Sequence, residues 1–372
     1  MPFETGAVRA RRFTIGAMMS PSFRNRRWLL PAIALAALSS HAFAQTPPEP
    51  ENPANTAELP TIVVSGEQPG PGLWKVSSGD HVMWILGTLS PLPKNMHWQP
   101  KDVEAAIASA QAVLDPPRVK INADVGFFGK IALLGSLVGV RDNPDHKTLQ
   151  QIVPPELYAR WMTLKTKYFG AGRSRNIESW RPIFAAIELW NEAIKKAGLT
   201  REDISDAVVA AAKRAKLELV APTYKLDIDD PRGAVKDFKN GEMDDLDCFA
   251  KTLDRLDSDL ATMTERANAW ATGDIARLRT LPDSDQREAC IAAITGMDLA
   301  RKRGISDLPE RIENTWVEAA SAALAKNAVT FARLPITDLL AKDGYLAKLK
   351  AKGYTVEAPD EVLDQPGDAA GE

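Results

Sequence analysis

Residues 81–115 constrain the fold most, because they combine a strand, a helix and a second strand within 35 residues. The apolar run Val82–Leu86 stops at Gly87-Thr88, which is typical of a buried strand. Residues 100–111 carry apolar side chains at helical spacing, and Ala112–Asp115 form a second short strand before two prolines. Because strands joined by such a helix run parallel, the chain is predicted to have an α/β fold.

The rest of the chain places strands at both ends and helices between them. A hairpin is predicted over residues 72–87, and the C-terminal part contains a strand at 328–334, a helix and a last strand at 354–359. Residues 121–327 are mostly helical in spacing, with one brief strand at 217–222. We therefore predict a small mixed sheet formed from the N- and C-terminal βα segments, with a large helical insertion over 121–327.

The limits of the folded domain follow from composition. Residues 45–59 are rich in Pro, Glu and Asn, so we expect a disordered leader there. Ordered structure is expected to begin near residues 59–64 and to extend to about residue 360. Residues 361–372 are expected to form a flexible tail.

Residues 1–44 have the pattern of a secretory signal peptide. Three arginines between positions 24 and 27 precede the apolar run Trp28–Leu38, and Ala42-Phe43-Ala44 fits a small-x-small cleavage site. The start codon is left open between Met1 and the pair Met18-Met19, and Arg11-Arg12 offers the alternative of a twin-arginine signal. The apolar run is too short for a stable membrane anchor. A soluble periplasmic or secreted protein is expected.

Charge argues against two classes of partner. Residues 1–44 contain six arginines and one glutamate, so 40 basic and 48 acidic side chains remain after them, a net charge of −8. An acidic balance disfavours nucleic acids and anionic membranes, which attract basic patches.

The chain contains two cysteines, Cys248 and Cys290. An even pair in an exported protein favours a disulfide, with two buried free thiols as the alternative.

Five segments, in the right order, give the chain a resemblance to the TraB/GumN family, which includes the Tiki metalloproteases. They are PGLWKVSSGDHVMWILGTL, VEAAIASAQAVLDPP, NAWATGDIARL, NTWVEAASAAL and DGYLAKLKAKGYTVE. The family's activity is attributed to two Gly-x-x-His motifs, one near each end, and to a glutamate on the strand after the first helix. Two imidazoles and a carboxylate can hold a divalent metal and leave a position open for water.

The positions expected to carry this chemistry are changed in this chain. The first motif is Gly87-Thr88-Leu89-Ser90, with serine in place of histidine. The second falls on Pro335-Ile336-Thr337-Asp338, and the glutamate position holds Asp115. An Arg-Asn pair of the family falls on Ile312-Glu313, or one residue earlier at Arg311. The resemblance therefore implies a divergent member that lacks both Gly-x-x-His histidines.

Two functions remain open for this altered site. The first is a catalytically degenerate protein without cofactor, whose former hydrolase cleft binds a peptide, a glycan or an envelope protein. The alternative is an active divalent-metal-dependent, peptidase-like hydrolase with the oxygen ligands Ser90, Asp115 and Asp338, which suit Mg²⁺, Ca²⁺ or Mn²⁺ better than Zn²⁺. The expected binding cleft comprises Gly87, Thr88, Ser90, His97, Asp115 and Asp338.

Other chemical interpretations have less support from the residues. A nucleophilic Ser90 would need an activating base, and no Gly-x-Ser-x-Gly is present. His97 is near enough to Ser90 in sequence to reach the cleft, although a lone loop histidine is more often solvated. Asp230 before Pro231 is predicted to be a helix N-cap rather than a cation ligand.

Overall fold

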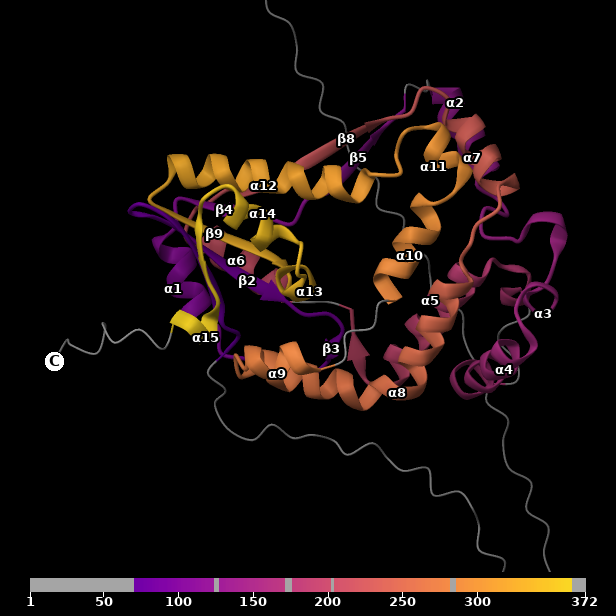
Figure 1. Cartoon of the computed structure of the whole chain (residues 1–372), viewed down its shortest axis with the longest axis horizontal. Helices are drawn as coiled ribbons and strands as arrows, with labels where there is room; N and C mark the ends of the chain where they lie inside the picture. The colour runs from indigo at the N-terminus through magenta and orange to yellow at the C-terminus, as the bar shows by residue number, and fades with distance from the viewer. Residues whose placement is uncertain (1–69, 124–126, 171–175, 202–203, 282–285, 363–372) are drawn as a thin grey trace, which may run out of the picture. The chain divides into compact units, whose positions relative to one another are not determined.

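A computed structural model of the protein describes residues 70–123, 127–170, 176–201, 204–281 and 286–362 (Figure 1). These residues all belong to one compact unit that spans residues 58–372. The signal peptide, the leader, the expected start of ordered structure at 59–64 and almost all of the tail lie outside the described residues.

The mixed α/β class predicted from the sequence is confirmed. The strands are β1 (Leu73–Ser78), β2 (His81–Thr88), β3 (Leu92–Pro93), β4 (Ala112–Leu114), β5 (Arg118–Asn122), β6 (Leu199–Thr200), β7 (Leu219–Val220), β8 (Thr223–Asp227), β9 (Val329–Pro335) and β10 (Thr355–Glu357).

Helices form most of the chain between β4 and β9 (Figure 1). The helices of the described chain are α1 (Lys101–Ser109), α2 (Phe127–Ser136), α3 (Leu149–Ile152), α4 (Pro155–Phe169), α5 (Pro182–Lys196), α6 (Ser205–Arg214), α7 (Pro231–Asn240), α8 (Leu246–Ala271), α9 (Ile275–Thr280), α10 (Gln286–Thr295), α11 (Asp298–Lys302), α12 (Leu308–Lys326), α13 (Ile336–Leu340), α14 (Tyr345–Ala351) and α15 (Pro359–Val362), with 3-10 turns at Pro144–His146 and Ile177–Ser179.

The main sheet has six strands in the order β10-β1-β2-β9-β4-β7. Strands β10, β1 and β2 pair antiparallel, whereas β2, β9, β4 and β7 run parallel. The predicted strand–helix–strand unit β2-α1-β4 is therefore parallel, but its two strands are not neighbours. Strand β9 lies between them, because its side chains from Thr330 to Leu334 are all buried and require a central position.

The parallel register brings three chain segments to one edge of the sheet. Thr88 at the end of β2 lies beside Pro335 at the end of β9, and Leu114 at the end of β4 lies beside Ala332. Asp115 and α13 follow directly at this edge. The positions singled out in the sequence are thus carried at the carboxyl ends of adjacent strands, where ligands bind in open α/β sheets.

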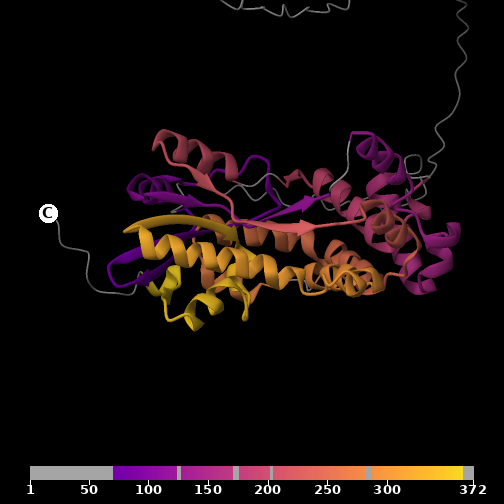
Figure 2. The same ribbon diagram turned by 90° about the horizontal axis from the view of Figure 1, so that it is seen from above.

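Both faces of the sheet are covered by helices. Arg333 of β9 reaches Ser205 of α6, while the next residue along β9 lies beside Gly87, which contacts Ile336 of α13. Because successive residues of a strand point to opposite faces, α6 and α13 lie on opposite sides. Figure 2 shows the same arrangement, with α12 and α14 on the side of the sheet away from α6.

The helical insertion has a core of its own. Its largest buried side chains include Trp161 of α4, Leu189 of α5 and Phe249 of α8, and the rings of Trp161 and Phe249 are 5.4 Å apart. Residues 246–271 form one continuous helix of 26 residues.

The insertion also contains strands that its spacing did not predict. The brief strand expected at 217–222 is β7, which extends the main sheet, but β5 and β8 form a separate parallel pair. Strand β5 alternates polar and apolar residues, but it is almost entirely exposed, including its apolar side chains Val119 and Ile121, so the alternation does not mark a buried face here.

Among the described helices, none combines the length and the apolar character needed to cross a lipid bilayer.

Candidate functional site

A cavity of about 480 Å³ lies beyond the carboxyl ends of β2 and β9. Ser90 follows β2, Thr337 and Asp338 belong to α13, and α8, α10, α12 and α14 contribute the other walls. The lining residues are Ser90, Arg255, Arg287, Glu288, Ile291, Pro309, Glu310, Glu313, Thr337, Asp338, Ala341, Gly344 and Tyr345. Two of the three predicted site residues, Ser90 and Asp338, therefore share one cavity.

Gly87 is required by the packing at the end of β2. A Cβ atom at this position would lie 2.9 Å from the Trp74 ring and 3.0 Å from Cγ1 of Ile336, both closer than ordinary contacts. The carbonyl oxygen of Gly87 accepts a hydrogen bond of 2.7 Å from Nε1 of Trp270. Trp270 opens the Trp-x-x-Gly-Asp segment, and its indole ties the end of α8 to the end of β2.

The side-chain hydroxyls of Thr88 and Ser90 both donate hydrogen bonds to backbone carbonyls. The buried Thr88 hydroxyl donates to the carbonyl oxygen of Leu334 over 3.4 Å. Ser90 is exposed, and its Oγ donates to the carbonyl oxygen of Arg201 over 2.9 Å. A hydroxyl that donates its only proton to a carbonyl is not positioned as an activated nucleophile, since no base accepts that proton.

Asp115 is 2% exposed and is held by two arginines. Its Oδ1 lies 2.7 Å from Nε of Arg333, and its Oδ2 lies 3.3 Å from Nη2 of Arg118. Its carbonyl oxygen accepts a hydrogen bond of 3.0 Å from Nε1 of Trp316. Asp115 does not line the cavity that contains Ser90 and Asp338.

Asp338 forms an ion pair with Arg287 of α10, which also lines the cavity. The Asp338 side chain is 11% exposed, whereas that of Arg287 is 59% exposed. Tyr345 is nearby, and burial together with the carboxylates of Asp338 and Glu313 raises the pKa of its phenol. The hydroxyl of Tyr345 therefore stays protonated and can act as a hydrogen-bond donor in the cavity.

Glu313 is a cavity residue that sequence reasoning named only as a changed family position. Its Oε2 pairs with Nζ of Lys348 over 2.9 Å, while its Oε1 is buried and accepts no hydrogen bond from the described residues. Glu313 precedes Trp316 by three residues on α12, so the two share a helix face. That spacing was a usable signal, since Trp316 belongs to one of the five family segments, and the structure shows it fully buried.

His97 lies in the loop before α1, and its side chain is exposed. It does not line the cavity, although its neighbour Trp98 packs against Trp270 with ring centroids 5.9 Å apart.

The predicted N-cap is confirmed, because Oδ1 of Asp230 accepts a hydrogen bond of 2.8 Å from the backbone of Gly233 in α7.

The residues at the altered positions do not fit a divalent metal. Asp115 and Asp338 each pair with arginine, and a cation placed on either carboxylate would lie beside a guanidinium. Ser90 is neutral and donates to a carbonyl. Within the described ranges, no group of three or more His, Cys, Asp or Glu side chains is arranged to hold a metal ion.

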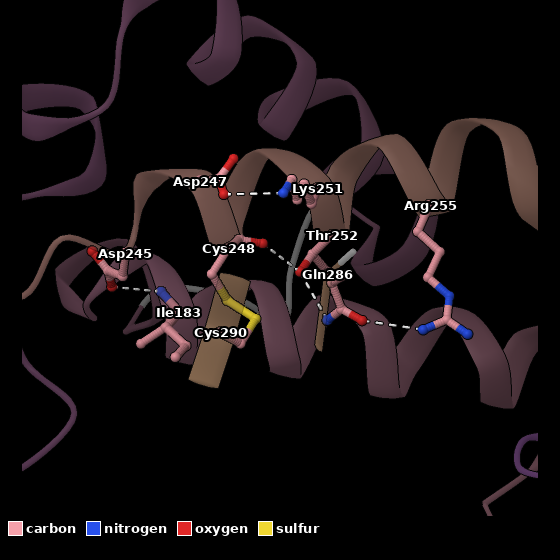
Figure 3. The surroundings of a disulfide bond; sticks show 9 residues. All are labelled: Ile183, Asp245, Asp247, Cys248, Lys251, Thr252, Arg255, Gln286 and Cys290. Carbon is pink, nitrogen blue, oxygen red and sulfur yellow. Dashed lines mark hydrogen bonds and ion pairs between the residues drawn. A yellow bond between two sulfur atoms is a disulfide. The ribbon is translucent and has the colours of Figure 1, made fainter. Parts of the chain in front are cut away.

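A disulfide joins two of the cavity walls (Figure 3). Cys248 of α8 and Cys290 of α10 are bonded, as the pairing predicted from the sequence requires. Two hydrogen bonds reinforce the same contact: Gln286 of α10 donates to Oγ1 of Thr252 over 3.0 Å and accepts from Arg255 over 3.1 Å (Figure 3). Sequence reasoning missed Arg255 and Arg287, because arginines on partly exposed helices carry no distinguishing pattern.

Comparison with known proteins supports the family indicated by the sequence. Residues 72–358 match the model of the TraB/PrgY/gumN family, and the chain belongs to this family. The matched region begins at β1 and ends directly after β10, so it includes the whole main sheet and the helical insertion. Searches of curated proteins and of solved structures found no match.

Proposed function

We propose that this member of the TraB/PrgY/gumN family is catalytically degenerate and uses the cavity beside β2 and β9 to bind a short peptide without hydrolysing it. The observation that carries the proposal is the pairing of both site carboxylates with arginine. Asp115 pairs with Arg333 and Arg118, and Asp338 pairs with Arg287.

The physical reason is the competition between a guanidinium and a metal for the same carboxylate. Asp115 and Arg333 are both buried, and taking the carboxylate of Asp115 away from Arg333 leaves the buried guanidinium without its charged partner. A metal ion that displaced Arg333 would therefore have to offset the cost of an unpaired buried arginine. A weak oxygen-ligand site offers too few ligands to supply that free energy.

The chemistry of the cavity suits a peptide better than a purely apolar ligand. Arg255 and Arg287 can donate to carbonyl and carboxylate oxygens, while Glu310 and Glu313 can accept from amino groups. Ile291, Pro309 and Ala341 provide an apolar wall. The volume of about 480 Å³ lies within the ordinary range of ligand sites, roughly 300 to 1,000 Å³.

Export to the periplasm or beyond is part of the proposal. Residues 1–44 have the composition of a secretory signal peptide. The Cys248–Cys290 disulfide supports this location, because structural disulfides persist in oxidising compartments.

The test compares metal content, hydrolysis and binding in the purified protein. Elemental analysis should find no stoichiometric divalent metal, and a mixture of random-sequence short peptides should remain intact. Peptides retained by the protein should be recovered by mass spectrometry, and Arg287→Glu should reduce their retention, whereas Arg214→Glu on the exposed Arg214–Glu104 pair should not. Stoichiometric metal with turnover that a chelator abolishes would instead establish the hydrolase alternative.

A further inference from the structure

We propose that residues 363–372, which follow α15, bind to a second cavity of the same chain through one apolar side chain and several carboxylates. This second cavity has a volume of about 250 Å³ and is lined by residues of β1, α9, α13, α14, β10 and α15. Helices α13 and α14 also contribute residues to the candidate site. The binding of the segment does not rest on the proposed function, whereas its effect on ligand binding does.

The second cavity has an apolar floor. Trp74 of β1 and Leu339 of α13 are buried there, and Leu346 of α14 and Val356 of β10 are half-buried. An aliphatic side chain placed on this floor removes apolar surface from water on both sides of the contact, which is favourable. The floor therefore suits a segment that carries at least one such side chain.

The rim of the second cavity is basic. Lys342, in the turn after α13, and Lys350 of α14 are exposed, and neither forms an ion pair with another described residue. Arg279 of α9 is already paired with Asp360. The acidic residue of the rim is Glu361, and one of its oxygens accepts a hydrogen bond of 2.9 Å from the backbone at the start of α15. The two free lysines favour an occupant with carboxylates.

The segment 363–372 has the complementary composition. Leu363 is its large aliphatic residue, its acidic residues are Asp364, Asp368 and Glu372, and it contains no lysine or arginine. A leucine followed directly by an aspartate matches an apolar floor below a lysine rim. We therefore expect Leu363 to contact the floor and the carboxylates to pair with the two lysines.

The segment also begins at the right place. Helix α15 ends at Val362, and Glu361 of this helix already lines the second cavity. Leu363 is thus two residues from the rim. The six residues from Leu363 to Asp368 span up to about 20 Å when extended, more than the width of a cavity of this volume. Because the segment is covalently attached, its effective concentration is high, and weak exposed ion pairs are enough to hold it.

Binding of the segment would support the wall of the candidate site from behind. Asp338 lines the candidate site, whereas the next residue, Leu339, lines the second cavity. Tyr345 and Leu346 of α14 are divided between the two cavities in the same way. Consecutive residues of a helix point about 100° apart, so α13 and α14 each present a different side to each cavity. The bound segment would therefore slow local opening of both helices.

Cross-linking of the full chain with a carbodiimide tests the binding directly, because this reagent joins a lysine to a carboxylate that it contacts. Mass spectrometry should find Lys342 or Lys350 joined to Asp364 or Asp368. Lys352, which is exposed directly after α14 but does not line the second cavity, is the matched control and should give less product. A mixture of unlabelled and ¹⁵N-labelled protein should show these links within one chain. Their absence, or links only between chains, would overturn the proposal.

Two sets of variants test the contacts that hold the segment. Leu363→Ser should lower the yield of these links at least about threefold, whereas the control Ala370→Ser should not. Equal yields for the two variants would refute the apolar contact.

Lys342→Glu combined with Lys350→Glu should speed amide exchange in α13 and α14 at least about threefold. Adding Asp364→Lys and Asp368→Lys should restore the slow exchange, because the charges are then exchanged between the partners. Lys352→Glu is the control and should leave exchange unchanged. Failure of the exchanged charges to restore protection would refute the ion pairs. A protein whose segment binds as described but which retains no peptide would refute only the proposed function.

Discussion

The Nε atom of Arg333 lies 2.7 Å from Oδ1 of Asp115, and both residues are buried in the main sheet. Arg333 belongs to β9 and Asp115 follows β4, so the ion pair joins two adjacent parallel strands at the edge where the altered family positions lie. Arg333 also donates to Oγ of Ser205 on α6. A charged pair thus occupies a position where the family resemblance implies a metal-site carboxylate.

Removing one partner of this pair should destabilise the fold strongly. Asp115→Ala leaves the buried guanidinium of Arg333 uncompensated, and we expect the free energy of unfolding to fall by about 3–5 kcal/mol in urea titrations. Asp115→Leu combined with Arg333→Met should recover most of the loss, since no charge then remains buried. Arg214→Ala, which breaks an exposed pair, should cost less than about 1 kcal/mol.

The glycine at the end of β2 should not tolerate a side chain. In Gly87→Ala the new Cβ would press on Trp74 and Ile336, and overpacking of this kind costs about 1–3 kcal/mol. Gly135 in α2 is the matched control, since a Cβ there meets no atom within 4 Å. Gly135→Ala should leave stability unchanged or raise it by up to about 1 kcal/mol. Equal thermal midpoints for Gly87→Ala and the wild type would contradict the packing argument.

The indole of Trp270 should stabilise the fold through its hydrogen bond to the Gly87 carbonyl as well as through the apolar area that it buries. Trp270→Phe leaves the buried Gly87 carbonyl without its donor, and we expect a loss of about 1–3 kcal/mol in chemical denaturation. Trp316→Phe should behave in the same way at the carbonyl of Asp115. Trp84→Phe removes an indole that makes no hydrogen bond within the described residues, so its cost should be smaller. A larger loss for Trp84→Phe would count against this account.

The cavity tyrosine should make stability sensitive to alkaline pH. The pKa of Tyr345 is raised above its ordinary value of 10.0 by burial and by the carboxylates of Asp338 and Glu313. The folded state therefore keeps the phenol proton more tightly than the unfolded state does. The contribution of the Tyr345 phenol to the free energy of unfolding is fully present below pH 10.0. It is lost as the pH rises from there through the pKa of Tyr345 in the folded state.

Denaturation of wild type and Tyr345→Phe at a series of alkaline pH values measures this contribution. Relative to Tyr345→Phe, the wild type should lose stability only above pH 10.0. Parallel curves for the two proteins across that range would show that Tyr345 is not buried beside the two carboxylates.

Local patterns were enough to predict the elements that bury one or both faces. The hairpin β1–β2, the helix α1 and the C-terminal strands follow from apolar spacing and from Gly and Pro at their ends. The N-cap at Asp230 follows from the proline after it. The exposed strand β5 was missed although its residues alternate between polar and apolar, because five residues beside a long helical segment give only a weak signal.

The position of β9 between β2 and β4 could not be predicted from local patterns. A connection through a helix fixes the direction of the next strand but not how many strand positions it skips. Likewise, nothing in the sequence shows that Arg287 faces Asp338 or that Arg333 faces Asp115, since each pair is joined only when distant segments pack together.

The sequence by itself determined the family, the α/β class and the absence of histidine at both Gly-x-x-His positions, because these depend on residue identity and spacing. Only the tertiary structure decided which groups surround Ser90, Asp115 and Asp338. The chemistry of a carboxylate is set by its neighbours, and here the neighbours are arginines contributed by segments 3 to 218 residues away along the chain.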